Sequence, residues 1–272
     1  MGKRLLLLLL LLPAALLLLG CALQEKLLFY PRSLPADLTF SAPAGAPFSL
    51  TEIRLPVAGA ELSGAHLALP RPRGALLFLH GNAGALDNWL PTVAPLTGLG
   101  WDVYVFDYRG FGKSSGHIRS QAELLADSEA MFARVRADFP AGPIVPVGYS
   151  IGSGLAAHLA QRERLPTVIL LAPYFSLAEL VREKAPWLPS FLLRYPLPSA
   201  DYLAAAPGTV TLIHGTADSL IPPAHSQRLQ KRLGARARLV LLPADHQSLL
   251  SAPGLLPALA EALPPAPSSP TP

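Results

Sequence analysis

The chain has 272 residues, of which 51% are hydrophobic, and this size and composition are typical of one globular domain with a single core. Its formal net charge is +4, and Lys3 and Arg4 near the N-terminus carry two of the positive charges. No cluster of Lys and Arg alternates with aromatic residues, and no Cys/His group has the spacing of metal ligands. The sequence therefore predicts a protein that binds neither nucleic acid nor a metal ion and that needs no cofactor.

The first predicted element is a leader. A leucine-rich run of 15 residues, 5–19, follows the two basic residues. A bilayer span needs about 20 apolar residues, so a run of this length is more typical of a signal peptide. The run leads through Gly20 into Cys21, the only cysteine in the sequence. This pattern resembles a bacterial lipobox, which implies removal of residues 1–20 and attachment of lipid to Cys21. An uncleaved signal anchor is the alternative.

A lipidated Cys21 implies a protein held on the extracytoplasmic side of a membrane. The four residues after Cys21 contain no aspartate. By the habit of such lipoproteins, this favours the outer membrane, facing the periplasm, in a bacterium with two membranes. Residues 21–45 are predicted to be a tether and lead-in, residues 46–264 the folded domain, and residues 265–272, which are rich in proline, a disordered tail.

Strands and helices alternate through the domain. Residues 48–55 and 60–69 alternate apolar and polar side chains, which predicts an antiparallel pair at the edge of a sheet. The later strands are nearly continuous apolar runs, as in a parallel sheet that helices cover on both faces. We predict strands at residues 75–79, 102–106, 144–147, 167–171, 209–213 and 238–242, and helices at residues 87–96, 121–139, 151–162 and 223–233. The predicted fold class is α/β, with a mostly parallel central sheet.

The most informative motif joins a predicted strand directly to a predicted helix. It reads Gly148-Tyr149-Ser150-Ile151-Gly152. A Gly-x-Ser-x-Gly in this context is the sharp turn that lifts a serine hydroxyl above a sheet. The turn is so tight that a side chain two residues before or after the serine would collide with its neighbours. The sequence therefore predicts Ser150 as a nucleophile.

A second copy of the same pattern has a different context. Gly112-Lys113-Ser114-Ser115-Gly116 follows a loop rather than a strand, and no helix begins directly after it. A phosphate-binding loop would need a glycine five positions before Gly112, where Asp107 stands. Ser114 is therefore predicted to be a loop residue and not the nucleophile.

A serine nucleophile needs a base and an acid that orients the base. Asp218 and His246 both follow predicted strands, in the order acid before histidine, and the loops at one edge of a parallel sheet lie together. Among the competing acids, Asp201 has the right order but no preceding strand, Asp107 precedes the serine, and Asp245 should point away from its neighbour His246. Among the other histidines, we interpret His214 as structural, His225 as exposed at a helix start, and His158 as packed or solvated.

Acyl transfer also needs N–H donors for the oxyanion. The backbone N–H of Ile151 is predicted to be one donor, since it lies at a helix N-terminus. The second is predicted to be the backbone N–H of Asn82, in the small-residue loop from His80 to Gly84 that follows a strand. A glycine-rich turn that binds no ligand is the alternative interpretation of this loop.

Four segments together resemble a known family. They are Phe106 to Gly112, His80 to Gly84, Gly148 to Gly152 and His214 to Asp218. These segments resemble the α/β-hydrolase superfamily, in its serine-aminopeptidase-like branch, over residues 27–263. The resemblance implies Ser150 as nucleophile, Asp218 as orienting acid and His246 as base.

In that superfamily, an insertion such as residues 174–207 covers the site and lines an acyl pocket. The insertion carries apolar side chains that look exposed in the sequence: Trp187, Leu188, Phe191, Leu192, Leu193 and Tyr195. A packed connection without substrate contact is the alternative for this short cap.

The resulting functional prediction is a membrane-anchored serine hydrolase. Its substrate would be a small-molecule or lipid ester or thioester, cleaved through an acyl-enzyme. A non-catalytic lipid-anchored binding protein, and an acyltransferase or peptidase on the same fold, are the alternatives. The sequence leaves the natural substrate and the oligomeric state open.

Overall fold

A computed structural model describes residues 24–186, 188–189 and 192–265. The predicted leader, the lipidation site Cys21, two apolar residues of the cap (Trp187 and Phe191) and nearly all of the predicted tail lie outside the described residues. Within the described part of the chain, no helix combines the length and apolar character needed to cross a membrane.

An eight-stranded sheet forms the centre of the molecule, in the order β10-β9-β8-β7-β4-β6-β3-β2. The strands are β2 (Ser49–Val57), β3 (Ala60–Ala68), β4 (Ala75–Leu79), β6 (Asp102–Phe106), β7 (Ile144–Tyr149), β8 (Thr167–Leu171), β9 (Thr209–Gly215) and β10 (Ala237–Leu242). Neighbouring strands in the run β10-β9-β8-β7-β4-β6 pair in parallel. Strand β3 is antiparallel to both of its neighbours, β6 and β2. The predicted antiparallel edge and parallel centre are both confirmed.

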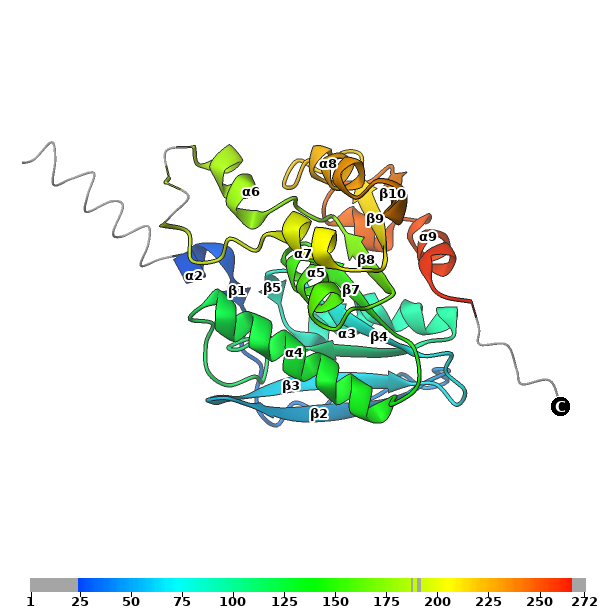
Figure 1. Ribbon diagram of the computed structural model, residues 1–272. Helices are drawn as coiled ribbons and strands as arrows, with labels where there is room; N and C mark the ends of the chain where they lie inside the picture. Colours follow the sequence, from blue (N-terminus) through cyan, green and yellow to red (C-terminus); the bar gives the residue numbers. More distant parts are fainter. Residues whose placement is uncertain (1–23, 187, 190–191, 266–272) are drawn as a thin grey trace, which may run out of the picture.

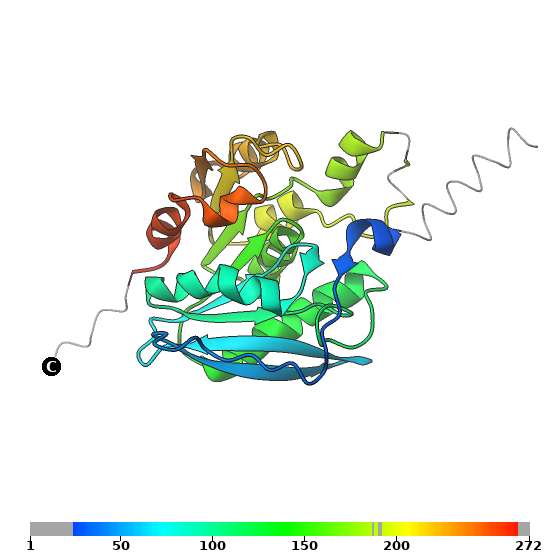
Figure 2. The same ribbon diagram turned by 180° about the vertical axis from the view of Figure 1, so that it is seen from behind.

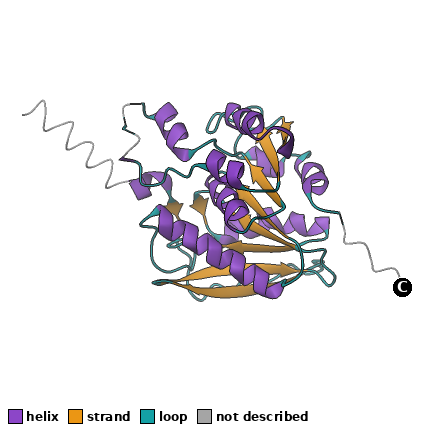
Figure 3. Cartoon of the chain, in the orientation of Figure 1, coloured by secondary structure: helices purple, strands orange, loops and turns teal. Residues whose placement is uncertain are grey.

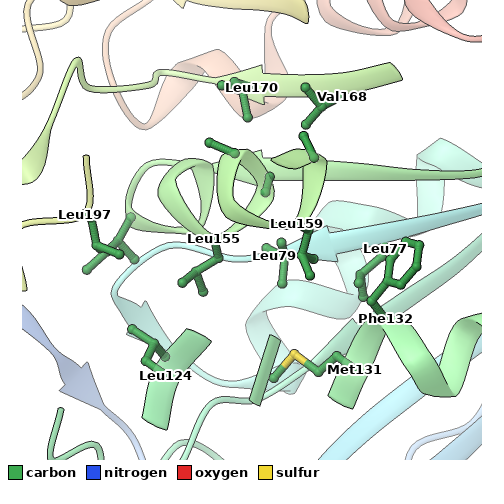
Figure 4. Packing of buried hydrophobic residues seen from close by; sticks show 14 of the residues in the cluster. Leu77, Leu79, Leu124, Met131, Phe132, Leu155, Leu159, Val168, Leu170 and Leu197 are labelled. Atoms are coloured by element: carbon green, nitrogen blue, oxygen red, sulfur yellow. The ribbon is translucent and has the colours of Figure 1, made fainter. Parts of the chain in front are cut away.

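Helices cover both faces of this sheet, as Figure 3 shows. The helices are α3 (Leu86–Val93), α4 (Gln121–Asp138), α5 (Ile151–Arg162), α6 (Leu177–Lys184), α7 (Ser199–Ala205), α8 (Ala224–Leu233) and α9 (Leu255–Ala262). One core lies between the sheet and α4, α5, α7 and α8, and the other between the sheet and α3 and α9. Leu77 and Leu79 of β4 face the first core beside Leu155 of α5 and Met131 of α4 (Figure 4), while Leu76 and Phe78 face the second.

The helix predicted at residues 87–96 ends earlier in the structure than the sequence indicated. Helix α3 stops at Val93, and a 3₁₀ helix, η1, continues from Ala94 to Leu99. Pro95 in the first turn of η1 has no N–H to donate to a carbonyl of α3, which removes one α-helical hydrogen bond at the point where α3 ends.

The lead-in is built into the fold from Gln24 onward. Helix α2 (Gln24–Leu28) is followed by β1 (Tyr30–Pro31), which pairs in parallel with β5 (Ala83–Gly84). From there the chain passes to the β2 end of the sheet (Figure 2). Residues 24–45, the described part of the segment that we predicted as a tether, therefore contribute secondary structure next to the predicted oxyanion loop.

Candidate active site

Ser150 lies in the turn between β7 and α5, with a φ of 54° and a ψ of −120°. Glycines stand two positions before and after Ser150, where other parts of the backbone lie too close for a side chain. A Cβ atom added to Gly148 would lie 2.4 Å from the carbonyl oxygen of Gly152, and one added to Gly152 would lie 2.0 Å from the carbonyl oxygen of Leu79. The steric reason predicted for both glycines is confirmed. The turn holds the Ser150 side chain at the carboxyl edge of the sheet, 7% exposed.

Hydrogen bonds connect Ser150 to the two partners predicted from chain order. Nε2 of His246 lies 3.0 Å from Oγ of Ser150, and Nδ1 of His246 lies 2.7 Å from Oδ2 of Asp218. A carboxylate only accepts hydrogen bonds, so Nδ1 carries the proton and Nε2 is free to accept from the serine hydroxyl. The three residues follow β7, β9 and β10, whose carboxyl ends meet at one edge of the sheet. We refer to Ser150, His246 and Asp218 as the candidate triad.

Asp218 is held in its charged form. Burial raises the pKa of this carboxyl, but contacts with His214 and His246 and a hydrogen bond from the N–H of Ile221 lower it more, and the net pKa lies well below its usual range. The Ile221 N–H donates to Oδ1 at 2.8 Å. The Asp218 side chain therefore offers His246 a stable negative charge.

His214 contributes to this environment in a way that the sequence interpretation missed. It is fully buried, and its Nε2 lies 3.3 Å from Oδ2 of Asp218 and 2.8 Å from the carbonyl oxygen of Ile221. Its Nδ1 lies 2.6 Å from Oγ of Ser226 on α8. His214 thus has the structural role that we predicted, and in addition its side chain contacts the acid of the candidate triad. Because His214 lies in β9 and Asp218 in the loop after it, their spacing of four residues does not indicate a contact as it would in a helix.

The competing acids do not contact His246. Asp201 lies on α7, is 65% exposed in its side chain and forms an ion pair with Arg232 at 2.6 Å. Asp245 accepts hydrogen bonds from the N–H and the hydroxyl of Ser248, both at 2.7 Å, and so points away from His246 as predicted. Asp107 is fully buried behind the loop that contains Asn82.

Behind that loop, Asp107 lies near His80. Nε2 of His80 and Oδ1 of Asp107 are 3.7 Å apart, and both side chains are fully buried. Burial lowers the pKa of His80 to about 4 and raises the pKa of Asp107 to about 7. Neutral His80 has its Nδ1 2.6 Å from the carbonyl oxygen of Gly81, to which it donates. His80 therefore supports the start of the loop, a role that the sequence interpretation did not assign.

The two predicted oxyanion donors lie beside Ser150. Ile151 begins α5, so its N–H has no carbonyl partner within the helix. The Asn82 side chain donates to the carbonyl oxygen of Leu28 at 2.8 Å, and its own carbonyl accepts from the N–H of Tyr30 at 2.8 Å. Ser150, Ile151 and Asn82 all line one cavity.

Ser114 has a structural environment instead. Its Oγ accepts from the N–H of Ser63 at 2.8 Å and donates to the carbonyl oxygen of Asp107 at 2.8 Å, and the side chain is buried. It follows no strand, as the sequence predicted, and its hydroxyl is already used by two backbone groups.

Ser114→Ala should lower the free energy of unfolding by about 1–3 kcal/mol, because it leaves two buried backbone groups without a partner. Urea denaturation followed by circular dichroism measures this change. The matched control is Ser115→Ala, which removes a similar bond to the N–H of Glu61 at an exposed position and should cost less. An equal cost for both variants would contradict this account of Ser114.

The prediction that His225 is exposed was wrong. Its side chain is buried at the start of α8, where Nδ1 accepts from the N–H of Phe175 at 3.1 Å and Nε2 lies 3.1 Å from Glu183. The segment 174–184 packs over this end of α8, which the local sequence does not reveal. His158 is packed as predicted, with Nε2 2.8 Å from Glu129.

Two cavities meet at Ser150. One, of about 510 Å³, lies between α2 and α6 and is mainly apolar. The other, of about 340 Å³, is lined by His246 and by polar side chains such as Asn88 and Gln247. The cap contributes Leu188 and Leu193 to the first cavity, so it reaches the site rather than only connecting elements. Among the described apolar side chains of the cap, Tyr195 and Leu193 are buried and Leu188 and Leu192 are partly buried, so these four are more covered than the sequence indicates.

No group of three or more His, Cys, Asp and Glu side chains that could hold a metal ion occurs among residues 24–186, 188–189 and 192–265.

Comparisons with known proteins agree with this architecture. A family model described as the alpha/beta hydrolase fold matches residues 74–206. The chain is 36% identical to the uncharacterized protein YfhR of Escherichia coli over 174 residues, 62% of this chain, and spans 61% of that protein's length. It is 30% identical to an uncharacterized protein of Mycobacterium tuberculosis over 227 residues, 81% of this chain and 79% of that protein.

A solved structure of a Pyrococcus furiosus esterase superposes with a TM-score of 0.68 at 19% identity, covering 85% of this chain and 97% of that one. A likeness at this identity speaks for the fold alone. Together, the sheet order, the serine turn, the family match and the relatives show that the chain belongs to the alpha/beta hydrolase superfamily.

Proposed function

We propose that this protein is a serine hydrolase that cleaves carboxylic esters or thioesters through an acyl-enzyme. The observation that carries the proposal is the unbroken line of hydrogen bonds from Ser150 through His246 to Asp218, at 3.0 and 2.7 Å. Such a line activates a serine, because the imidazole accepts the hydroxyl proton as the oxygen attacks.

In the first half of the proposed reaction, Oγ of Ser150 forms a bond to the acyl carbon while its proton moves to Nε2 of His246. The Asp218 carboxylate stabilises the resulting imidazolium, and the N–H groups of Ile151 and Asn82 donate to the oxyanion. His246 then gives the proton to the leaving oxygen or sulfur, and an acyl-Ser150 ester remains. In the second half, His246 takes a proton from a water molecule whose oxygen attacks the acyl carbon. The bond between this carbon and Oγ of Ser150 then breaks, His246 returns the proton to Oγ, and the acid is released.

Membership in the superfamily, and the likeness of the fold to a Pyrococcus furiosus esterase, support ester chemistry over the alternatives. A non-catalytic binding protein would have no need of an aligned base and acid behind its serine. Acyl transfer and peptide cleavage share the first half of the reaction and differ in the acceptor or the leaving group. We use the resemblance to the serine-aminopeptidase-like branch to support the serine mechanism, and we do not propose peptidase activity from it.

A fluorophosphonate probe, combined with nitrophenyl esters, tests this function. The probe forms a covalent bond only with an activated serine, so labelling at Ser150 and release of nitrophenol are the expected results. Absence of both with the folded full-length protein would favour the binding protein. Labelling at Ser150 with ester turnover only in the presence of an added alcohol or amine would favour the transferase.

We further propose that Cys21 carries lipid and holds the protein at a membrane. Cys21→Ser should therefore leave the leader uncut or shift the protein out of the membrane fraction. One acyl chain alone gives only marginal binding, so the anchor needs more than one chain.

Mass spectrometry of the mature N-terminus, together with cell fractionation, measures this outcome. Wild-type protein with an unmodified Met1, or with an unlipidated Cys21 in the membrane fraction, would refute the lipoprotein proposal.

A further inference from the structure

The larger cavity at Ser150 has walls from two distant parts of the chain. Leu27 and Leu28 of α2 line one side, and Leu180 and Val181 of α6 line the other. Figure 1 shows α2 and α6 on the same side of the molecule. The cavity of about 510 Å³ lies within the range of small-molecule sites and begins at the serine itself.

Specific hydrogen bonds fix α2 in this position. Gln24 is buried, its Nε2 donates to the carbonyl oxygen of Leu192 at 2.7 Å, and its Oε1 accepts from the N–H of Arg194 at 2.8 Å. In the next residue, Oε1 of Glu25 accepts from the hydroxyl of Tyr195 at 2.8 Å. One buried side chain thus satisfies two backbone groups of the cap, so α2 is docked rather than loosely attached.

The C-terminal end of α2 is bonded to the predicted oxyanion loop. Asn82 donates through its side chain to the carbonyl of Leu28 and accepts at its own carbonyl from Tyr30, both at 2.8 Å. The same segment therefore lines the cavity and holds the residue whose N–H would bind the oxyanion.

The position of His246 decides which part of a substrate enters which cavity. His246 must reach the leaving atom in order to protonate it. Ser150 and Asn82 line both cavities, but His246 lines only the smaller one, with Asn88 and Gln247, and Ile151 lines only the larger one. The leaving group therefore belongs in the smaller, more polar cavity, and the acyl chain belongs between α2 and α6.

We infer that the substrate is an ester of a long apolar acid and that α2 is a chain-selecting wall of its binding site. This inference rests on the proposed function and adds the acyl class and the role of α2. Each methylene of the acyl chain that leaves water for this cavity should raise kcat/KM by about fourfold, until the cavity is filled.

The test compares nitrophenyl acetate with nitrophenyl octanoate as substrates of the full-length protein. Wild-type protein should prefer octanoate by about a hundredfold or more in kcat/KM, as expected if most of the added methylenes are buried. Val181→Trp places an indole in the cavity and should lower this preference at least tenfold. Arg182→Trp adds the same bulk at the next, exposed position of α6 and should keep the preference.

Gln24→Ala tests the docking of α2 separately. Loss of both bonds to the cap should again lower the octanoate preference at least tenfold, while Lys26→Ala, at an exposed position of the same helix, should not. A thermal melt of each variant reports whether it folds. Two variants on opposite walls keep the test decisive if one of them fails to fold.

The outcomes separate this inference from the proposed function. Wild-type protein that neither reacts with the fluorophosphonate probe nor cleaves either ester would overturn the proposed function. Wild-type protein that reacts with the probe but prefers acetate would overturn the acyl class alone. Folded Gln24→Ala and Val181→Trp proteins that keep the wild-type preference would overturn the assignment of the cavity walls.

Discussion

Ser150→Ala should abolish ester hydrolysis and fluorophosphonate labelling. By comparison with the loss of the serine in subtilisin, turnover should fall by about 10⁶-fold. The reason is that the Ser150 hydroxyl combines an aligned base at 3.0 Å with a position above the sheet edge. Nitrophenyl ester turnover and in-gel probe fluorescence measure the two effects.

The matched control is Ser114→Ala, which removes the serine of the second Gly-x-Ser-x-Gly. This variant should keep probe labelling, because the Ser114 hydroxyl is engaged by Ser63 and Asp107 and has no base beside it. Near-normal turnover in purified Ser150→Ala protein, or loss of labelling only in Ser114→Ala protein, would overturn the assignment.

Asp218→Asn should lower turnover by about 10⁴-fold while the protein stays folded. An amide that donates to Nδ1 of His246 favours the tautomer with the proton on Nε2, which then cannot accept the serine proton. The carboxylate in the wild-type protein prevents this, because its pKa is held well below the usual range and the group stays charged. Single-turnover kinetics with a nitrophenyl ester measure the loss.

Asp201→Asn is the control for this second prediction, since Asp201 was the competing acid in chain order. Its carboxylate pairs with Arg232 at the surface, so turnover should remain within a few-fold of wild type. If Asp201→Asn removed activity and Asp218→Asn did not, the acid would have been assigned to the wrong loop.

Much of the candidate site was predictable because its signals are local. Each residue of the candidate triad comes within five positions of the end of a predicted strand, and parallel strands bring their carboxyl ends to one edge. The glycines around Ser150 signal a tight turn for a steric reason that needs no knowledge of the rest of the fold. Strand ends and turn chemistry therefore sufficed to bring Ser150, Asp218 and His246 together.

The parts that were missed depend on contacts between distant segments. The bond from Gln24 to Leu192 joins residues 168 positions apart, and a five-residue helix such as α2 has almost no periodic pattern of its own. Phe175 and Glu183 of the cap bury His225, although its local sequence, a histidine shortly after two prolines, indicated exposure. Such packing is set by tertiary contacts and not by local propensity.

The backbone of Ser150 has an evolutionary consequence. Its φ of 54° with a ψ of −120° is a conformation that glycine adopts freely and other residues rarely, and it costs about 1–3 kcal/mol. A domain has a net stability of only about 5–15 kcal/mol. Folding by itself would therefore favour a glycine at position 150, and a lineage released from the need for the hydroxyl would gain stability by losing it.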